Sequence, residues 1–202
     1  MKNMTPSPYH QKYLNRDAQD MAERIHAKET DFQQTIDQIS FAPTSSPVKI
    51  AVLGCAVKYF VPVHKEVFAK VLGKPVEVTT FDITIEHLAG EENVVQHDCT
   101  LPLPGGPYDM TYSSILLKFI ETEKQWDVLY NSYVALKAGG IAVHYVGTEE
   151  GDAIDVKLGY NHVPFARWRE EFKKHNIYFV ELHIKTGPKL NGDEVVWVLF
   201  KK

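Results

Sequence analysis

A nearly continuous apolar run that ends in a glycine does most to limit the folds open to this chain. Residues 48–53 are Val-Lys-Ile-Ala-Val-Leu, and Gly54 follows directly. An apolar run of this length indicates a strand buried on both faces, as in a parallel sheet. The segment 62–72 then has valines at helical spacing. A strand, a glycine turn and a helix are the first half of a nucleotide-binding βαβ unit.

Length and charge exclude several classes of protein. The 202 residues fit one domain, with room for an appended segment, and the formal net charge of -4 gives no electrostatic reason to expect nucleic acid. No apolar run reaches the roughly 18 residues of a membrane span, and the first residues lack the apolar stretch of a signal peptide. Cys55 and Cys99 fall in separate predicted turns, so we expect reduced thiols and a cytoplasmic location.

The rest of the chain alternates between strand and helix patterns. Further strands are predicted at 76–81, 93–96, 108–112, 141–146, 178–185 and 194–201, and helical segments at 85–89, 114–120, 123–136 and 164–175. Gly139 and Gly140 are expected to stop the third of these helical segments. The last two strands must form an antiparallel hairpin, because the loop between them is too short for a crossover. The fold class is therefore α/β and Rossmann-like.

An amphipathic helix or helix pair is predicted ahead of this sheet, over residues 15–39. Apolar residues recur there at spacings of three, four and seven. One interpretation is a helix packed over the sheet edge, and the other is a lid over a cofactor pocket. Because 43–47 is a polar, proline-bounded linker, we divide the chain into a helical cap with linker, 1–46, and a main domain, 47–202.

From Val48 to Lys202, about three quarters of the chain, the sequence resembles the class I S-adenosylmethionine-dependent methyltransferases. The order of the predicted elements is theirs, and four segments match local motifs of the family. These are Ala51-Val52-Leu53-Gly54-Cys55-Ala56, Asp82, His97-Asp98-Cys99-Thr100-Leu101-Pro102-Leu103-Pro104 with Tyr108-Asp109, and Leu136-Lys137-Ala138-Gly139-Gly140. The resemblance implies a three-layer sandwich with a mostly parallel seven-stranded sheet, a terminal antiparallel hairpin and N-terminal helices.

The resemblance also implies S-adenosylmethionine (SAM) as cofactor. Asp82 would accept hydrogen bonds from the ribose hydroxyls, and Asp98 would accept one from the adenine amino group. Each aspartate also has a purely structural interpretation, as the cap of the turn that follows it. Tyr112 and Ser113 stand where cofactor and acceptor meet in the family. The implied cofactor-binding residues are Gly54, Cys55, Ala56, Asp82, Ile83, Asp98, Cys99, Tyr112 and Ser113.

The glycine turn departs from the family's pattern at three positions. Val52 replaces an acidic residue, and Ala56 and Lys58 replace two glycines. A Cβ at Ala56 narrows the gap between backbone and ligand, and it penalises a left-handed conformation by roughly 1–2 kcal/mol. Lys58 would approach the methionyl carboxylate as a cation or point into solvent. A methyltransferase-like protein without catalysis would show such substitutions.

Methyl transfer needs few catalytic groups, because it is an in-line displacement that depends mainly on positioning. A general base is needed only if the accepting atom must lose a proton. Four residues are candidates for that role: Tyr112, His144, Tyr145 and His64. No metal site is expected, since His97-x-Cys99 is too sparse for a ligand set.

Three functional hypotheses follow. The leading one is methyl transfer from SAM to a small molecule, favoured over a macromolecular acceptor because the sequence has no basic face or separate recognition domain. The second is a catalytically inactive methyltransferase-like binding or regulatory protein. The third is an NAD-linked oxidoreductase, which the terminal hairpin and the single-glycine turn disfavour. The sequence does not indicate an oligomeric state.

Overall fold

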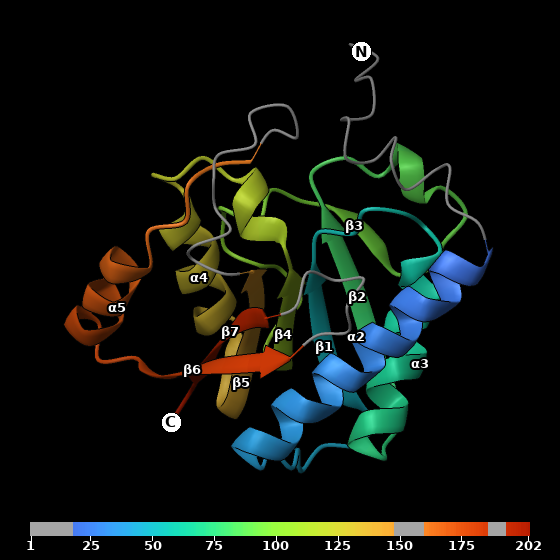
Figure 1. Ribbon diagram of the computed structural model, residues 1–202, viewed down its shortest axis with the longest axis horizontal. Helices are drawn as coiled ribbons and strands as arrows, with labels where there is room; N and C mark the ends of the chain where they lie inside the picture. The colour runs from blue at the N-terminus through green and yellow to red at the C-terminus, as the bar shows by residue number, and fades with distance from the viewer. Residues whose placement is uncertain (1–17, 148–159, 186–192) are drawn as a thin grey trace.

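A seven-stranded sheet forms the centre of the molecule (Figure 1). The computed structural model describes residues 18–147, 160–185 and 193–202. The strand order is β3-β2-β1-β4-β5-β7-β6, and of the described strands only β7 runs in the opposite direction to the others. The predicted α/β fold, with its mostly parallel sheet and terminal antiparallel hairpin, is confirmed.

The described elements lie close to the predicted ones, with one exception at β5. The strands are β1 (Val48–Leu53), β2 (Val76–Asp82), β3 (Val94–Gln96), β4 (Tyr108–Ser114), β5 (Leu136–Gly147), β6 (Tyr178–Lys185) and β7 (Asp193–Phe200). The helices are α2 (Ala18–Ile39), α3 (Phe60–Leu72), α4 (Gln125–Val134) and α5 (Phe165–Lys174), with short 3-10 turns η1 (Glu86–Leu88) and η2 (Leu116–Phe119).

The glycine stop predicted at Gly139 and Gly140 is wrong. The preceding helix, α4, already ends at Val134, and both glycines lie inside β5. A Cβ on Gly140 would sit 2.9 Å from the backbone oxygen of Asp109, so glycine lets β5 approach β4 closely where their pairing is irregular. A glycine pair after a helical pattern is compatible with both roles, and the sequence alone does not distinguish them.

Helices cover both faces of the sheet, which gives the predicted three layers. α2 and α3 lie on one face, and α4 and α5 on the other (Figure 1). The buried strand β1 contributes to both cores: Val52 belongs to the core under α2 and α3, and the next residue, Leu53, to the core under α4 and α5. Among the helices that the structure describes, none is both long enough and apolar enough to cross a membrane.

The N-terminal helix α2 is packed into the first of these cores. The ring of Phe32 is fully buried, and its centroid lies 4.9 Å from that of Phe68 in α3 and 6.1 Å from that of Tyr112 in β4. Further along the helix, the Thr35 hydroxyl lies 2.8 Å from the Tyr145 hydroxyl of β5. α2 therefore extends across this face of the sheet, from α3 towards the edge strand β6.

Truncation of Phe32 should strongly destabilise the protein. Phe32→Ala removes a buried ring that joins α2, α3 and β4, so we expect the free energy of unfolding to fall by about 3–5 kcal/mol. Urea denaturation followed by tryptophan fluorescence measures the loss. Leu101→Ala, at a side chain that is 54% exposed, is the control and should change stability by no more than about 0.5 kcal/mol. A loss below about 1 kcal/mol for Phe32→Ala would mean that α2 is not part of the core.

Candidate functional site

The backbone conformation of the turn after β1 favours glycine. Gly54 has a φ of +76°, a conformation that other residues rarely adopt, and its N–H donates to the carbonyl oxygen of Phe81 at 2.7 Å. A Cβ on Gly54 would also lie 2.9 Å from Cδ1 of Leu116, which comes from the turn after β4. The turns that follow β1 and β4 therefore meet at this glycine.

Asp82 closes the same turn from the end of β2. Its Oδ2 accepts a hydrogen bond from the Cys55 N–H at 2.8 Å, and its Oδ1 accepts one from the Thr84 N–H at 3.2 Å. The carboxylate is half-buried, and the next side chain, Ile83, is 61% exposed. The capping role considered for Asp82 is therefore real. It still leaves the carboxylate with further lone pairs for a ligand, since each carboxylate oxygen can accept more than one hydrogen bond.

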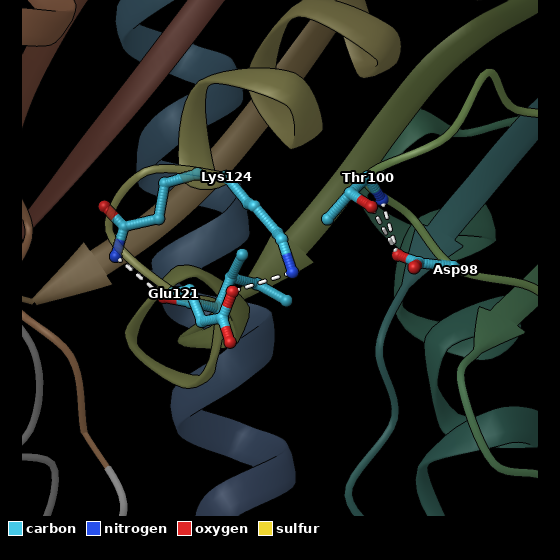
Figure 2. A network of polar contacts seen from close by, with 6 residues as sticks. Asp98, Thr100, Glu121 and Lys124 are labelled. Carbon is cyan, nitrogen blue, oxygen red and sulfur yellow. Dashed lines mark hydrogen bonds and ion pairs between the residues drawn. The ribbon is translucent and has the colours of Figure 1, made fainter.

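Asp98 caps its own turn just beyond β3. Its Oδ1 accepts hydrogen bonds from the Thr100 backbone N–H at 2.9 Å and from the Thr100 hydroxyl at 2.7 Å (Figure 2). These two bonds lower the pKa of the Asp98 carboxyl, so it is ionised at neutral pH. Lys124, paired with Glu121 at 2.7 Å, lies across from this turn (Figure 2).

The structure brings the ends of β1, β2 and β3 together at one edge of the sheet. Beyond the bond between Cys55 and Asp82, the His97 N–H donates to the carbonyl oxygen of Asp82 at 2.8 Å. Gly54, Asp82 and Asp98 thus lie at the carboxyl ends of three adjacent parallel strands. Open α/β sheets bind their ligands at this carboxyl edge, so the predicted cofactor residues near these three positions form one candidate site.

Ser113 and His144 lie inside the protein instead. The Ser113 hydroxyl is 2.8 Å from Nδ1 of His144, and the Ser132 hydroxyl of α4 is 2.9 Å from Nε2. All three side chains are fully buried, and burial lowers the pKa of His144 to about 3. Both nitrogens of this neutral imidazole are hydrogen-bonded, so His144 links β4, β5 and α4. Neither nitrogen is free to act as a base towards a methyl acceptor.

The other three candidate bases lie together on the opposite face, beneath α2. The ring centroid of Tyr112 is 5.5 Å from that of Tyr145 and 5.6 Å from that of His64. Lys28 of α2 donates to the Tyr112 hydroxyl at 3.2 Å. Burial raises the pKa of both phenols, so they stay protonated, and it lowers the pKa of His64 well below its usual value, so its imidazole is neutral.

Sequence reasoning missed two acidic residues at this face. Burial raises the pKa of Asp31, in α2, to about 6 and that of Glu194, at the start of β7, to about 7. A row of polar residues lies beside the apolar stripe of α2 at spacings of three and four: Lys28, Asp31 and Thr35. This row is the pattern from which inward-facing polar side chains could have been predicted. Glu194 has no comparable signal, because a strand end near a hairpin loop is typically solvated.

A strained residue after β4 was also missed. Ile115 has a φ of 62°, which is rare for a β-branched side chain and costs of order 1–3 kcal/mol. Its N–H donates to the carbonyl oxygen of Tyr145 at 2.8 Å. This conformation turns the chain into η2, and the next side chain, Leu116, reaches Gly54.

Solved structures share this fold. The N-methyltransferase NodS from Bradyrhizobium japonicum WM9, in complex with S-adenosyl-l-homocysteine (SAH), matches with a TM-score of 0.55 and 11% identity, over 84% of this chain and 85% of that chain. The chain has the fold of the class I SAM-dependent methyltransferases. LepI in complex with SAM matches this methyltransferase fold with a TM-score of 0.59 and 16% identity, over 81% of this chain and 45% of LepI.

The methyltransferase fold does not by itself fix the reaction. A structure described as a pericyclic reaction enzyme also matches, with a TM-score of 0.58 and 14% identity, over 81% of this chain and 45% of that one. No family model and no curated protein matches the sequence. At these identities the likeness establishes the fold, and the activity must be argued from the residues of this chain.

The buried His144 should make stability depend on pH. Its pKa is about 3 in the folded protein and near 6.5 when unfolded, so the stability gained by keeping it neutral is fully present above pH 6.5 and is lost as pH falls towards 3. Between pH 7.5 and pH 5 the wild type should lose about 2 kcal/mol relative to His144→Gln. Urea unfolding of both proteins at the two pH values measures this, and a difference that does not change with pH would contradict it.

Proposed function

We propose that this protein transfers a methyl group from SAM to a small-molecule acceptor. The observation that best supports the proposal is the grouping of Gly54, Asp82 and Asp98 at the carboxyl ends of three adjacent strands, tied together by the bond from the Cys55 N–H to Asp82. This edge includes the topological switch point between β1 and β4, where open α/β sheets bind nucleosides. The structural neighbour NodS holds SAH on the same fold.

The residues present fit the adenosine half of the cofactor. The half-buried Asp82 carboxylate would accept hydrogen bonds from two ribose hydroxyls. Ile83 is 61% exposed and offers an apolar surface to a face of the adenine ring. The ionised Asp98 would accept a hydrogen bond from the adenine amino group.

Fewer residues of the chain match the methionyl half of SAM. Val52, at the position where the family has an acid, is fully buried in the core and has no polar atom to offer the ammonium group. Lys58 is exposed in the turn, and its ammonium would pair with the methionyl carboxylate. We therefore expect cofactor affinity to depend mainly on the adenosine contacts.

The chain's own residues would act chiefly by positioning. The cofactor, when bound, supplies a methyl group on a positively charged sulfur. The turn after β4, fixed by Ile115 and by Leu116 against Gly54, would set the distance between the cofactor and acceptor sides of the site. The Tyr112 hydroxyl, held by Lys28, would hydrogen-bond and orient the acceptor for in-line attack.

A binding or regulatory protein without catalysis is the second candidate. The replacements at Val52, Ala56 and Lys58 favour it, because they weaken the half of the site that holds the methionyl group. An NAD-linked oxidoreductase ranks below both, although Asp82 would serve the ribose of NAD equally well. Ligand binding and turnover separate the three functions.

Replacement of Asp82 should weaken binding of the cofactor product. We expect SAH to bind the wild type in isothermal titration calorimetry, and Asp82→Ala to lose at least tenfold in affinity, since hydrogen bonds to a charged group contribute about 1.5–3 kcal/mol. Glu92→Gln, at an exposed position, is the matched control and should bind like the wild type. Circular dichroism checks that Asp82→Ala still folds. Unchanged affinity in Asp82→Ala, or a wild type that binds NAD and not SAH, would refute the proposal.

Turnover should distinguish the enzyme from the binding protein. Incubation with methyl-labelled SAM and a low-molecular-weight cell extract should yield SAH and a labelled small molecule, both detected by mass spectrometry. Heat-denatured protein is the control. SAH binding without any SAH production above that control would favour the non-catalytic protein instead.

A further inference from the structure

Several buried polar atoms beneath α2 have no hydrogen-bond partner among the residues that the structure describes. They are Oδ1 of Asp31, Oε1 of Glu194 and both ring nitrogens of His64. Asp31 is only 5% exposed and His64 only 4% exposed, so bulk water does not satisfy them. Buried polar groups in native proteins are nearly always bonded, and leaving them unbonded is destabilising. Asp31 and Glu194 also act electrostatically on each other, so a ligand that reaches both carboxyl oxygens would account for their retention.

These groups come from three elements and lie around the same pair of tyrosines. The His64 ring of α3 contacts the Tyr112 ring, with centroids 5.6 Å apart. Asp31 of α2 and Glu194 of β7 both act electrostatically on Tyr145, and the Tyr145 ring contacts the Tyr112 ring. The cluster therefore lies at the carboxyl ends of β4 and β5, on the α2 side.

The chemistry of the unpartnered atoms favours an amine. Ionised carboxyl oxygens only accept hydrogen bonds, so Asp31 and Glu194 in their ionised forms present two neighbouring acceptors. An alkylammonium group carries up to three N–H donors and a positive charge, whereas a hydroxyl group has one donor. Among the described residues, no group of three or more His, Cys, Asp or Glu side chains is arranged to hold a metal ion.

The surroundings already accommodate a primary ammonium group. Nζ of Lys28 lies 5.4 Å from the ring centroid of Phe60 and 5.4 Å from that of Tyr112. Aromatic faces attract cations of this kind, and the attraction is larger where water is excluded. A second amine entering beside Asp31 and Glu194 would meet two carboxyl groups next to the rings of Tyr112 and Tyr145.

We propose that this cluster is the methyl-acceptor site, that it takes a primary or secondary amine, and that Glu194 accepts the proton from the attacking nitrogen. The inference rests on the proposed methyl transfer. An N–H proton of the ammonium passes to the Glu194 carboxylate and leaves a lone pair on nitrogen. That lone pair forms a bond to the methyl carbon while the bond from carbon to sulfur breaks, and the electron pair of the broken bond stays on sulfur.

The groups around Glu194 favour the uptake and release of a proton by its carboxyl group. Burial is the main reason why its pKa rises to about 7, and Asp31 of α2 raises it further. Lys28 of α2, Lys118 of η2 and the Gly147 backbone N–H of β5 lower it. Among the described residues, Glu194 also interacts electrostatically with Tyr112 and Tyr145, whose hydroxyls are protonated. A carboxyl with a pKa near neutral both takes and releases a proton at physiological pH.

Matched amines and alcohols test the inference. We would titrate the wild type with ethylamine, cyclohexylamine and phenethylamine, and with the alcohols and carboxylic acids of the same carbon skeletons, with and without saturating SAH. At least one amine should bind tenfold or more tightly than its alcohol and its acid. Glu194→Gln and Asp31→Asn should each lose at least tenfold in amine affinity and keep wild-type affinity for SAH. Glu92→Gln should change neither affinity.

The outcomes separate this inference from the proposed function. If SAH binds but every amine binds no more tightly than its matched alcohol, the acceptor assignment is overturned and the proposed function stands. If amines bind selectively but SAH does not bind, the cluster is an amine site in a protein without the proposed cofactor, which overturns its role as a methyl-acceptor site. The comparison of amine with alcohol uses the wild type alone, so it does not depend on whether a variant folds.

Discussion

The hydrogen bond from the Cys55 backbone N–H to Oδ2 of Asp82 joins the ends of β1 and β2, and the candidate cofactor site depends on it. It holds the glycine turn against β2 at the place where Leu116, from the turn after β4, contacts Gly54. One carboxylate thereby orders the backbone of the site and remains half-exposed for a ligand. The structural role of Asp82 and its proposed ligand-binding role follow from the same position, and they do not exclude each other.

The two faces of the sheet have different chemistry near its carboxyl edge. On the α4 side, Ser113, His144 and Ser132 satisfy one another, and the neutral imidazole is a closed structural link. On the α2 side, Asp31 and Glu194 have buried oxygens without partners among the described residues. Because reactive groups need unoccupied donors or acceptors, we place the proposed methyl-acceptor site on the α2 side. The helix that covers this side is therefore part of the proposed acceptor site as well as of the core.

Local sequence patterns predict the fold well, but they predict the residues of the proposed methyl-acceptor site poorly. The buried strand β1, the helix α5 and the terminal hairpin follow from periodicities within short segments. Asp82 and Asp98 are conspicuous because they lie at or just beyond the ends of strands. The link between Ser113 and His144 depends on the register of β4 against β5, which no local pattern specifies. Glu194 is a candidate only once the fold buries it beneath α2, because its charge and its place near a hairpin end are typical of solvated residues.

Backbone amide shifts during an SAH titration test the central claim most directly. In two-dimensional 1H–15N spectra, the account predicts that the largest changes fall on the amides that surround the edge of β1, β2 and β3, namely those of Gly54, Cys55, Ile83 and Cys99. Smaller changes would extend to Ile115 and Leu116 in the turn after β4. Spectra that stay unchanged at saturating SAH, or changes confined to β6 and β7, would contradict the account.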